Sequence, residues 1–400
     1  MHRATGSSRT IIIAGAGIGG LSAALALAAR DFRVVVIDKA ERLEETGAGI
    51  QLSPNASAVL LGLGLGDRLH ETAIALDEIR IRSSRNRRIV DLPLGRDAEL
   101  HFGAPYLIIH RADLQAALLE AAQANPDIAI ELGLTVDRWV SHPNGVTVQC
   151  LSGDTAIDRH GIALIGADGL WSTLRARLGD ESAPRFAGRT AWRATLPAKE
   201  VDPEYRERAV HLWLGGKAHL VAYPVRARRA INLVAIAADT APSSGWSTSA
   251  PRAEVLARFP RWVWHADIRD ILALPRDWLK WPLFDRPPLT HWGRGLMTLL
   301  GDAAHPMLPF LAQGAGMAIE DAAVLAECLA AARGDIEAGL RRYEGLRRPR
   351  TAKVQRTARL NDRLYHFRWP VSLARNLALK AVGGERLLAR YDWIYDWRQG

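Results

Sequence analysis

The residues with the clearest chemical meaning form the run Gly15-Ala16-Gly17-Ile18-Gly19-Gly20 near the N-terminus. Gly15 permits a tight turn, Gly17 lets the backbone approach a pyrophosphate, and Gly20 lets a helix pack closely on a strand. Asp38 ends the next apolar run, where a carboxylate can accept hydrogen bonds from a ribose. An ordinary glycine-rich turn is the alternative. The register of strand, helix and acidic residue favours a dinucleotide site, for FAD or NAD rather than NADP.

Two later motifs also carry polar groups at strand ends. The run 166–175 contains Asp168, and the run 301–306 contains Asp302 and His305. The first run, with Ser172 and Arg175 after Asp168, could be no more than a capped helix start, and His305 could be an ordinary turn histidine. Asp302 follows a buried strand, where it could accept hydrogen bonds from polyol hydroxyls. The backbone N–H groups of residues 314–316 open a predicted helix, and such groups suit an anionic oxygen.

The elements that must position these groups follow from apolar periodicity. A strand at 10–14, a helix at 19–29 and a strand at 33–38 predict a βαβ unit. Further strands are expected at 106–110, 145–151, 162–167 and 296–301, with helices at 112–124 and 316–332. Short β-rich runs at 190–196, 210–214, 220–225 and 231–237 predict an antiparallel sheet.

These elements predict the α/β fold class, with a Rossmann-like domain and an inserted antiparallel-sheet domain. We expect the first domain to be discontinuous, over residues 8–183 and 289–345. The inserted domain covers 184–288, and a C-terminal helical region covers 346–400.

Composition narrows the class of protein. The 400 residues carry 52 basic and 43 acidic side chains, a net charge of +9, which raises the question of nucleic acid. The densest arginine cluster, in residues 341–350, is interrupted by Tyr343, Glu344 and Pro349, so we expect a solvated helix face and no nucleic-acid partner. Two cysteines cannot build a disulfide framework or a cysteine-based zinc site.

An uncharged stretch at 11–29 could pass for a membrane segment or signal peptide. Its four glycines, and the charged residues and second apolar run that follow, fit a buried strand, turn and helix better. We therefore expect a cytoplasmic protein with no membrane partner.

The three motifs, in this order and spacing, resemble those of the single-component flavoprotein aromatic hydroxylases, the class A flavin monooxygenases. The likeness is greatest to the branch with salicylate hydroxylase, 3-hydroxybenzoate 6-hydroxylase and 6-hydroxynicotinate 3-monooxygenase. The resemblance covers nearly the whole chain. Its most specific part is the stretch 301–322, and the runs 47–56 and 110–114 also match.

The resemblance implies a bound FAD held by the first and third motifs, with NADH or NADPH as reductant and O2 as cosubstrate. It places Arg111 near the flavin or its phosphates, and Asp168 in a segment associated with both FAD and the pyridine nucleotide. Gln51 is a weaker candidate for lining the flavin. The remaining implied contacts are the backbone groups of Gly314 and Ala315. The reaction of the family passes through a flavin C4a-hydroperoxide that hydroxylates an electron-rich ring.

His219 and Tyr223 are the catalytic candidates, because residues four apart on a strand face the same side. Spacing alone favours a histidine that merely packs in the sheet. The resemblance reverses this, because its branch carries a His-x-x-x-Tyr here, with histidine as base and tyrosine contacting substrate. It also places Gln313 near the substrate.

The expected substrate is a small phenolic or hydroxylated N-heteroaromatic acid. A larger ring, such as a quinolone or polyketide, is the alternative substrate class. A nucleic-acid partner and a non-catalytic FAD scaffold are the alternatives from other classes of function. A homodimer would be ordinary for this group.

Overall fold

The buried apolar runs near the N-terminus form the middle of a parallel sheet. The computed structural model describes residues 9–43, 48–242 and 247–398, so Gly47 and the predicted domain start at position 8 lie outside it. Strand β1 (Thr10–Ala14), helix α1 (Ile18–Ala28) and strand β2 (Arg33–Asp38) confirm the predicted βαβ unit. The six strands lie in the order β19-β20-β12-β1-β2-β8. The other four are β8 (Ile128–Leu132), β12 (Ala163–Gly166), β19 (Gly293–Arg294) and β20 (Met297–Leu299).

The strand order places the ends of β1, β12 and β20 side by side. All pairs are parallel except β19 with β20. Because parallel strands end at the same sheet edge, the glycine loop and the residues around Asp168 and Asp302 meet there. Strands separated by more than a hundred residues thus bring the three sequence motifs together.

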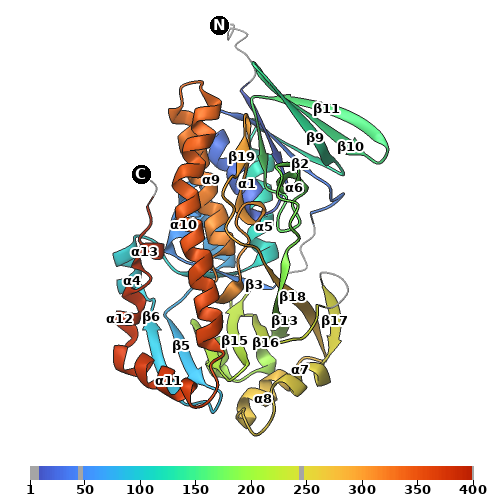
Figure 1. The fold of residues 1–400 in the computed structure, drawn as a ribbon. Coiled ribbons are helices and arrows are strands. Elements are labelled where there is room, and N and C mark those ends of the chain that lie inside the picture. The colour runs from blue at the N-terminus through green and yellow to red at the C-terminus, as the bar shows by residue number, and fades with distance from the viewer. Residues whose placement is uncertain (1–8, 44–47, 243–246, 399–400) are drawn as a thin grey trace.

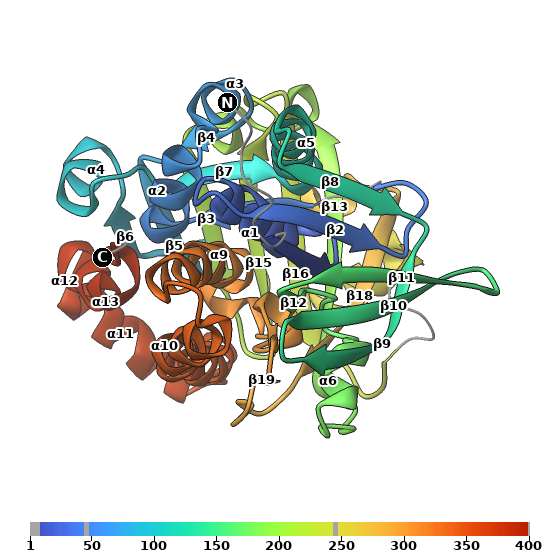
Figure 2. The ribbon, with the colours of Figure 1, turned by 90° about the horizontal axis from the view of Figure 1, so that it is seen from above.

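Helices and two small sheets surround this parallel sheet (Figures 1 and 2). The helices are α2 (Pro54–Gly62), α3 (Gly66–Thr72), α4 (Arg96–Phe102), α5 (Arg111–Ala124), α6 (Thr173–Arg177), α9 (Gly314–Ala331) and α10 (Ile336–Tyr365). One small sheet contains β3 (Gly49–Leu52), β4 (Ile74–Ala75) and β7 (Leu107–His110). The other contains β9 (Thr135–His142), β10 (Gly145–Ser152) and β11 (Thr155–Gly161), and Figure 2 shows it extending to one side.

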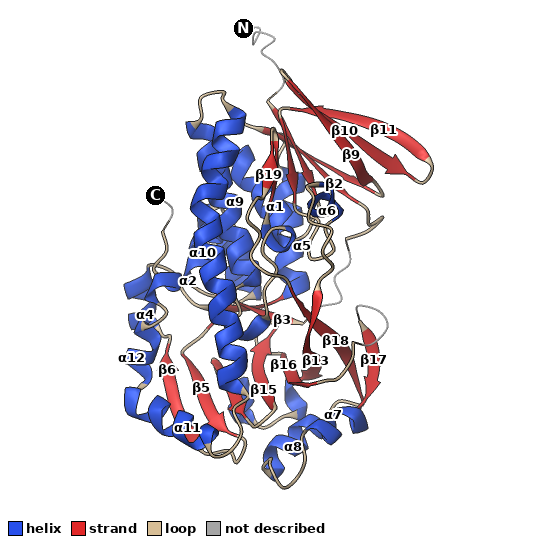
Figure 3. Cartoon of the chain, viewed as in Figure 1, coloured by secondary structure: helices blue, strands red, loops and turns tan. Residues whose placement is uncertain are grey.

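A second, eight-stranded sheet lies below the first in Figure 3. Its order is β17-β18-β13-β16-β15-β14-β5-β6. The strands are β5 (Glu78–Ser83), β6 (Arg88–Pro93), β13 (Arg185–Pro197), β14 (Ala209–Leu214), β15 (Ala218–Val225), β16 (Ala230–Ala238), β17 (Thr248–Pro251) and β18 (Asp277–Asp285). Helices α7 (Arg252–Arg258) and α8 (Ala266–Ala273) and turns η1 (Ala198–Glu200) and η2 (Pro203–Arg206) accompany it.

Two features of the fold differ from the domain boundaries that the sequence pattern predicts. It takes β5 and β6 from residues that the pattern placed with the first domain, and β14 pairs with β5 in parallel. Helix α10 also runs without a break across the predicted boundary between residues 345 and 346. The division into domains stays a prediction.

The arginine cluster on α10 is not the solvated face that we expected. Arg347 is buried, and its guanidinium pairs with Glu320 at 2.6 Å and with Asp321 at 2.7 Å, both on α9. Arg350 pairs with the same Glu320 at 2.7 Å. The expectation was wrong because the acidic partners come from a different helix, which the local pattern does not reveal.

The chain ends in short helices that pack beside β5 and β6 (Figure 1). They are α11 (Val371–Val382), α12 (Gly384–Ala389) and α13 (Asp392–Tyr395). In the described part of the chain, none of the helices has the length and apolarity to cross a bilayer. Within the same residues, no cluster of histidine, cysteine and acidic side chains could hold a metal ion.

Candidate functional site

A cavity of about 340 Å³ lies between the glycine loop and the second sheet. One end is lined by Gly17, the N-terminus of α9 and turn η3 (Gly301–Ala303). The other end is lined by β13, β15, β16 and turn η4 (Pro309–Leu311). The cavity therefore brings the dinucleotide motifs and the predicted catalytic strand to one space.

The glycine loop is shaped so that only glycine fits at two of its positions. Gly15 has a φ of +115°, and a Cβ there would overlap the carbonyl oxygen of Ala167. A Cβ at Gly20 would overlap the carbonyl oxygen of Gly15. A Cβ at Gly17 would meet nothing within 4 Å, so this position leaves open space in front of the loop. This geometry supports the roles that the sequence suggested for the three glycines.

Asp38 holds the loop from the end of β2. Its carboxylate accepts hydrogen bonds from the backbone N–H of Ala16 at 2.7 Å and of Ala40 at 2.9 Å. Asp38 is only partly buried, so its oxygens can accept further bonds from a ribose.

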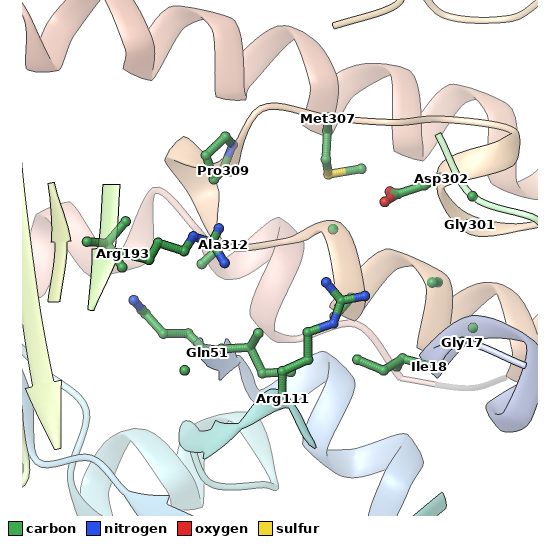
Figure 4. Close-up of a pocket in the computed structure, with 18 of the residues that line it drawn as sticks. Gly17, Ile18, Gln51, Arg111, Arg193, Gly301, Asp302, Met307, Pro309 and Ala312 are labelled. Carbon is green, nitrogen blue, oxygen red and sulfur yellow. The ribbon is translucent and has the colours of Figure 1, made fainter. Parts of the chain in front are cut away.

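The middle of the cavity offers groups that suit a dinucleotide. Gly314 and Ala315, the first residues of α9, line it, and the backbone N–H groups of a helix N-terminus attract anions. Figure 4 shows the carboxylate of Asp302 pointing into the space and the guanidinium of Arg111 rising into it from the opposite wall. Asp302 keeps accessible surface inside the cavity, while burial by the walls raises the pKa of its carboxyl. These groups fit FAD, since they offer an acceptor for hydroxyls and donors for phosphate or ring oxygens.

Asp168 does not line the cavity, although its neighbours Ala167 and Gly169 do. Its Oδ2 accepts a hydrogen bond from the backbone N–H of Thr173 at 2.9 Å, at the start of α6. Ser172 is the N-cap of α6 and accepts from the backbone N–H of Arg175 at 2.9 Å, so the run forms the capped helix start that the sequence left open as the simpler interpretation. A role for Asp168 in cofactor binding stays a prediction.

The second sheet presents His219 and Tyr223 to the cavity from the same face of β15. His219 is buried, and burial lowers the pKa of its imidazole well below the ordinary value, with His366 and Arg189 lowering it further. The Tyr223 hydroxyl donates to the carbonyl oxygen of Gly49 at 2.6 Å, and burial raises its pKa.

Sequence reasoning missed Arg193 on β13. The register aligns Arg193 with Val234 and Val234 with Val221, and Val221 lies between His219 and Tyr223 on β15. Arg193 therefore faces the same space from two strands away, roughly 10 Å across the sheet. Figure 4 shows it reaching in from the strands, opposite Asp302.

No carboxylate among the described residues pairs with Arg193. Its guanidinium lies over the Trp281 ring, 4.8 Å from the centroid, and Nε is buried without a hydrogen-bond acceptor. Burial lowers the pKa of this group, and the positive charge of Arg111 lowers it further. A lone arginine within the apolar run 190–196 is the signal that could have found it.

The two glutamines are placed differently. Gln51 lines the cavity and accepts a hydrogen bond from the Tyr106 hydroxyl at 3.0 Å. Gln313 is not among the described residues that line the cavity. Its Nε2 donates to Ser53 at 2.8 Å, and its Oε1 accepts from Asn55 at 3.2 Å. Its predicted contact with substrate stays a prediction.

Comparison with known proteins agrees with this geometry. A family model described as FAD binding domain matches residues 8–358. The chain is 36% identical over 392 residues to 3-hydroxybenzoate 6-hydroxylase 1 of Aquipseudomonas alcaligenes, covering 98% of this chain and 97% of that protein. It is 37% identical over 388 residues to 3-amino-4-hydroxybenzoate 2-monooxygenase of Streptomyces cremeus, covering 96% and 94%. The solved structure of Klebsiella pneumoniae HpxO complexed with FAD and uric acid is similar with a TM-score of 0.86 and 26% identity, covering 98% of each chain.

Proposed function

The chain belongs to the FAD-binding class A flavin monooxygenases and is an FAD-dependent aromatic monooxygenase, and we propose that its substrate is a small aromatic acid. The ring would be phenolic or a hydroxylated N-heterocycle, hydroxylated with NAD(P)H and O2. Two relatives at 36% and 37% identity are named for hydroxybenzoate or aminohydroxybenzoate hydroxylation, which supports this substrate class.

The observation that carries the proposal is the position of Arg193. Within the described ranges, Arg193 stands in the cavity wall with no carboxylate partner, which calls for an anion in that cavity, because a buried cation is costly unless it is paired. Across the sheet, Arg193 aligns with Val221, which lies between His219 and Tyr223 on β15. An aromatic acid whose carboxylate contacts Arg193 therefore has its hydroxyl group near His219 and Tyr223.

Ionisation of the phenol is the task that this chain's side chains can perform. A phenol with a pKa near 10 is only ~0.1% ionised at pH 7, a deficit of about 4 kcal/mol. His219 stays neutral because burial lowers its pKa, so a ring nitrogen can accept the phenolic proton. Loss of that proton makes the ring electron-rich and ready to receive oxygen.

Bound FAD would supply hydride uptake from NAD(P)H and activation of O2. Arg111, Asp302 and the N-terminus of α9 would hold it at one end of the cavity. Arg193 would orient the substrate at the other end, and the apolar side chains Val221, Val234 and Ile236 would exclude water.

Anaerobic reduction of the flavin tests the proposal. The FAD-loaded protein is mixed with NADH, alone and with each of a panel of hydroxybenzoates and hydroxypyridine carboxylates. We expect one acid to accelerate flavin bleaching by orders of magnitude, and aerobic turnover of that acid to give a hydroxylated product. Retained FAD with no response to any small acid would contradict the proposed substrate class.

A further inference from the structure

The surroundings of His219 disfavour the protonated form of its imidazole. Its side chain is only 2% exposed, and burial, His366 and Arg189 together lower the pKa of its imidazole. A histidinium formed there would be a buried cation, with the Arg189 charge near it. If His219 accepts a proton from a phenol on one ring nitrogen, it must therefore release a proton from the other ring nitrogen at the same time.

A chain of hydrogen bonds leads away from His219. Its Nδ1 lies 2.9 Å from Nε2 of His366, the residue that follows α10. Nδ1 of His366 lies 2.7 Å from the carbonyl oxygen of Asp362 and 3.0 Å from its Oδ1. The Asp362 carboxylate also accepts a hydrogen bond from Nε of Arg189 on β13 at 2.9 Å.

The hydrogen-bonding partners of His366 determine which ring nitrogens of His366 and His219 carry a hydrogen. Both atoms near Nδ1 of His366 are oxygen acceptors, so Nδ1 carries a hydrogen. A neutral imidazole that carries its hydrogen on Nδ1 has Nε2 as an acceptor, and Nε2 of His366 faces Nδ1 of His219. His219 then donates from Nδ1, and its Nε2 is left as the basic nitrogen.

We infer that His366 and Asp362 form a proton relay that makes His219 an effective base, an inference that rests on the proposed function. The phenol O–H bond breaks as its proton binds Nε2 of His219, and the proton on Nδ1 of His219 passes to Nε2 of His366. The proton on Nδ1 of His366 passes to Asp362 and then to water. The products are a phenolate in the cavity, one proton in solvent and both imidazoles with their hydrogen on Nε2. The reverse transfer, when the bound phenolate is protonated again, restores the starting tautomers, and no redox change occurs in the relay.

The far end of the relay is suited to release the proton. The Asp362 side chain is 19% exposed, so it reaches water. Burial acts to raise the pKa of Asp362, but its hydrogen bond from His366 and the Arg189 charge outweigh burial and lower it, so the carboxyl does not retain the proton. The titratable or charged side chains facing His219 and His366 are Arg189 from β13, and Asp362 and Tyr365 from α10.

The tautomers can be tested without substrate. Long-range ¹H–¹⁵N spectra of FAD-loaded protein labelled with ¹⁵N-histidine report which ring nitrogen carries hydrogen, and the single variants His219→Gln and His366→Gln assign the signals. We expect hydrogen on Nδ1 and a bare Nε2 in both residues. A hydrogen on Nε2 of His219 in the wild-type protein would overturn the relay, whatever the substrate is.

Proton release tests the transfer itself. Oxidised, FAD-loaded protein is mixed with 3-hydroxybenzoate in weak buffer with phenol red, and the flavin spectrum reports binding in the same experiment. We expect wild-type protein to release a proton as fast as the ligand binds. In His366→Gln and Asp362→Asn, binding persists while proton release slows roughly tenfold or more.

A matched control is His211→Gln. His211 is a buried histidine on the neighbouring strand β14, in ring contact with Tyr205 and Trp213 and apart from the relay. It should release the proton at the wild-type rate. Release at the wild-type rate in His366→Gln would overturn the relay. A flavin spectrum that does not respond to 3-hydroxybenzoate would count against the proposed substrate, and the tautomers would then decide the relay.

Discussion

Among single residues, Arg193 should determine the preference for an acid. Replacing it with glutamine keeps a polar group on β13 but removes the charge that the substrate carboxylate would meet. Loss of one partner of a buried charge pair typically costs 2–5 kcal/mol, so we expect KM for the best aromatic acid to rise roughly 30-fold or more. Steady-state kinetics with the same ring lacking its carboxylate provides the control, and KM for it should change little. An equal loss for both ligands would mean that Arg193 only packs against Trp281.

Asp302 should govern retention of the cofactor. Burial by the cavity walls raises the pKa of its carboxyl, because burial disfavours the charged form. The hydroxyl groups of a bound FAD would donate hydrogen bonds to the carboxylate and stabilise that charged form. We expect Asp302→Ala to weaken FAD binding by about tenfold or more, since a hydrogen bond to a charged group contributes about 1.5–3 kcal/mol. Flavin fluorescence in the filtrate after ultrafiltration measures the loss. The exposed Asp270→Ala is the control, and a fully yellow, stable Asp302→Ala protein would remove Asp302 from the cofactor site.

Among the elements, helix α10 ties both ends of the site to the rest of the chain. Near its middle, Arg350 pairs with Glu320 on α9 and donates to the carbonyl oxygens of Trp393 and Ile394 on α13. Glu320 in turn accepts a hydrogen bond from Asn55 at 2.6 Å. Asp362 lies near the C-terminal end of the same helix, so α10 supports both the cofactor side and the substrate side.

The C-terminal helix should loosen when Arg350 is lost. We expect Arg350→Met to lower the free energy of unfolding by on the order of 2 kcal/mol and to speed proteolysis after residue 390. The matched control is Arg342→Met, the same substitution at an exposed position of the same helix, which should change stability by less than about 0.5 kcal/mol. Urea denaturation and limited proteolysis measure the two effects. Equal proteolysis of both variants would show that α13 is held by apolar packing alone.

How far the sequence predicts these elements depends on the range of their contacts. The strand at 10–14 and the strand at 33–38 coincide with β1 and β2, because buried runs and a glycine turn are local signals. The joining of β5 to β14 could not be predicted, since it pairs Glu78 with Ala209. The direction of the Gln313 side chain could not be predicted either, because its hydrogen-bonding partner Ser53 lies 260 residues earlier in the sequence.

In the whole molecule, the site lies where two sheets of different origin meet. The parallel sheet supplies the glycine loop, and the second sheet supplies His219, Tyr223 and Arg193. Buried charges join turn η3, which lines the cavity, to helices α9 and α10. Asp321 on α9 accepts hydrogen bonds from the backbone N–H of Gly301 at 3.0 Å, from His305 and from Arg347.

Acid should therefore weaken the whole fold through Asp321. Burial acts to raise the pKa of its carboxyl, but His305 and Arg347 outweigh burial and lower it to about 2. The unfolded carboxyl titrates near pH 4, so between these values the unfolded chain binds a proton that the folded chain does not. The stabilisation is complete above about pH 5 and is lost as pH falls through 2 toward 1, by about 1 kcal/mol at pH 3 and about 2 to 3 kcal/mol in full.

Urea denaturation at pH 6 and pH 3, with FAD in fixed excess because bound ligand adds to stability, measures this loss. Asp321→Asn should be less stable than wild type at pH 6, because Arg347 loses a charged partner in the interior. Its further loss at pH 3 should be smaller than that of wild type by about 1 kcal/mol. The exposed Asp154→Asn should keep the wild-type pH dependence. If Asp321→Asn and wild type lose equal stability at pH 3, the acid sensitivity arises from other carboxyls, and the ion pair between Asp321 and Arg347 does not control it.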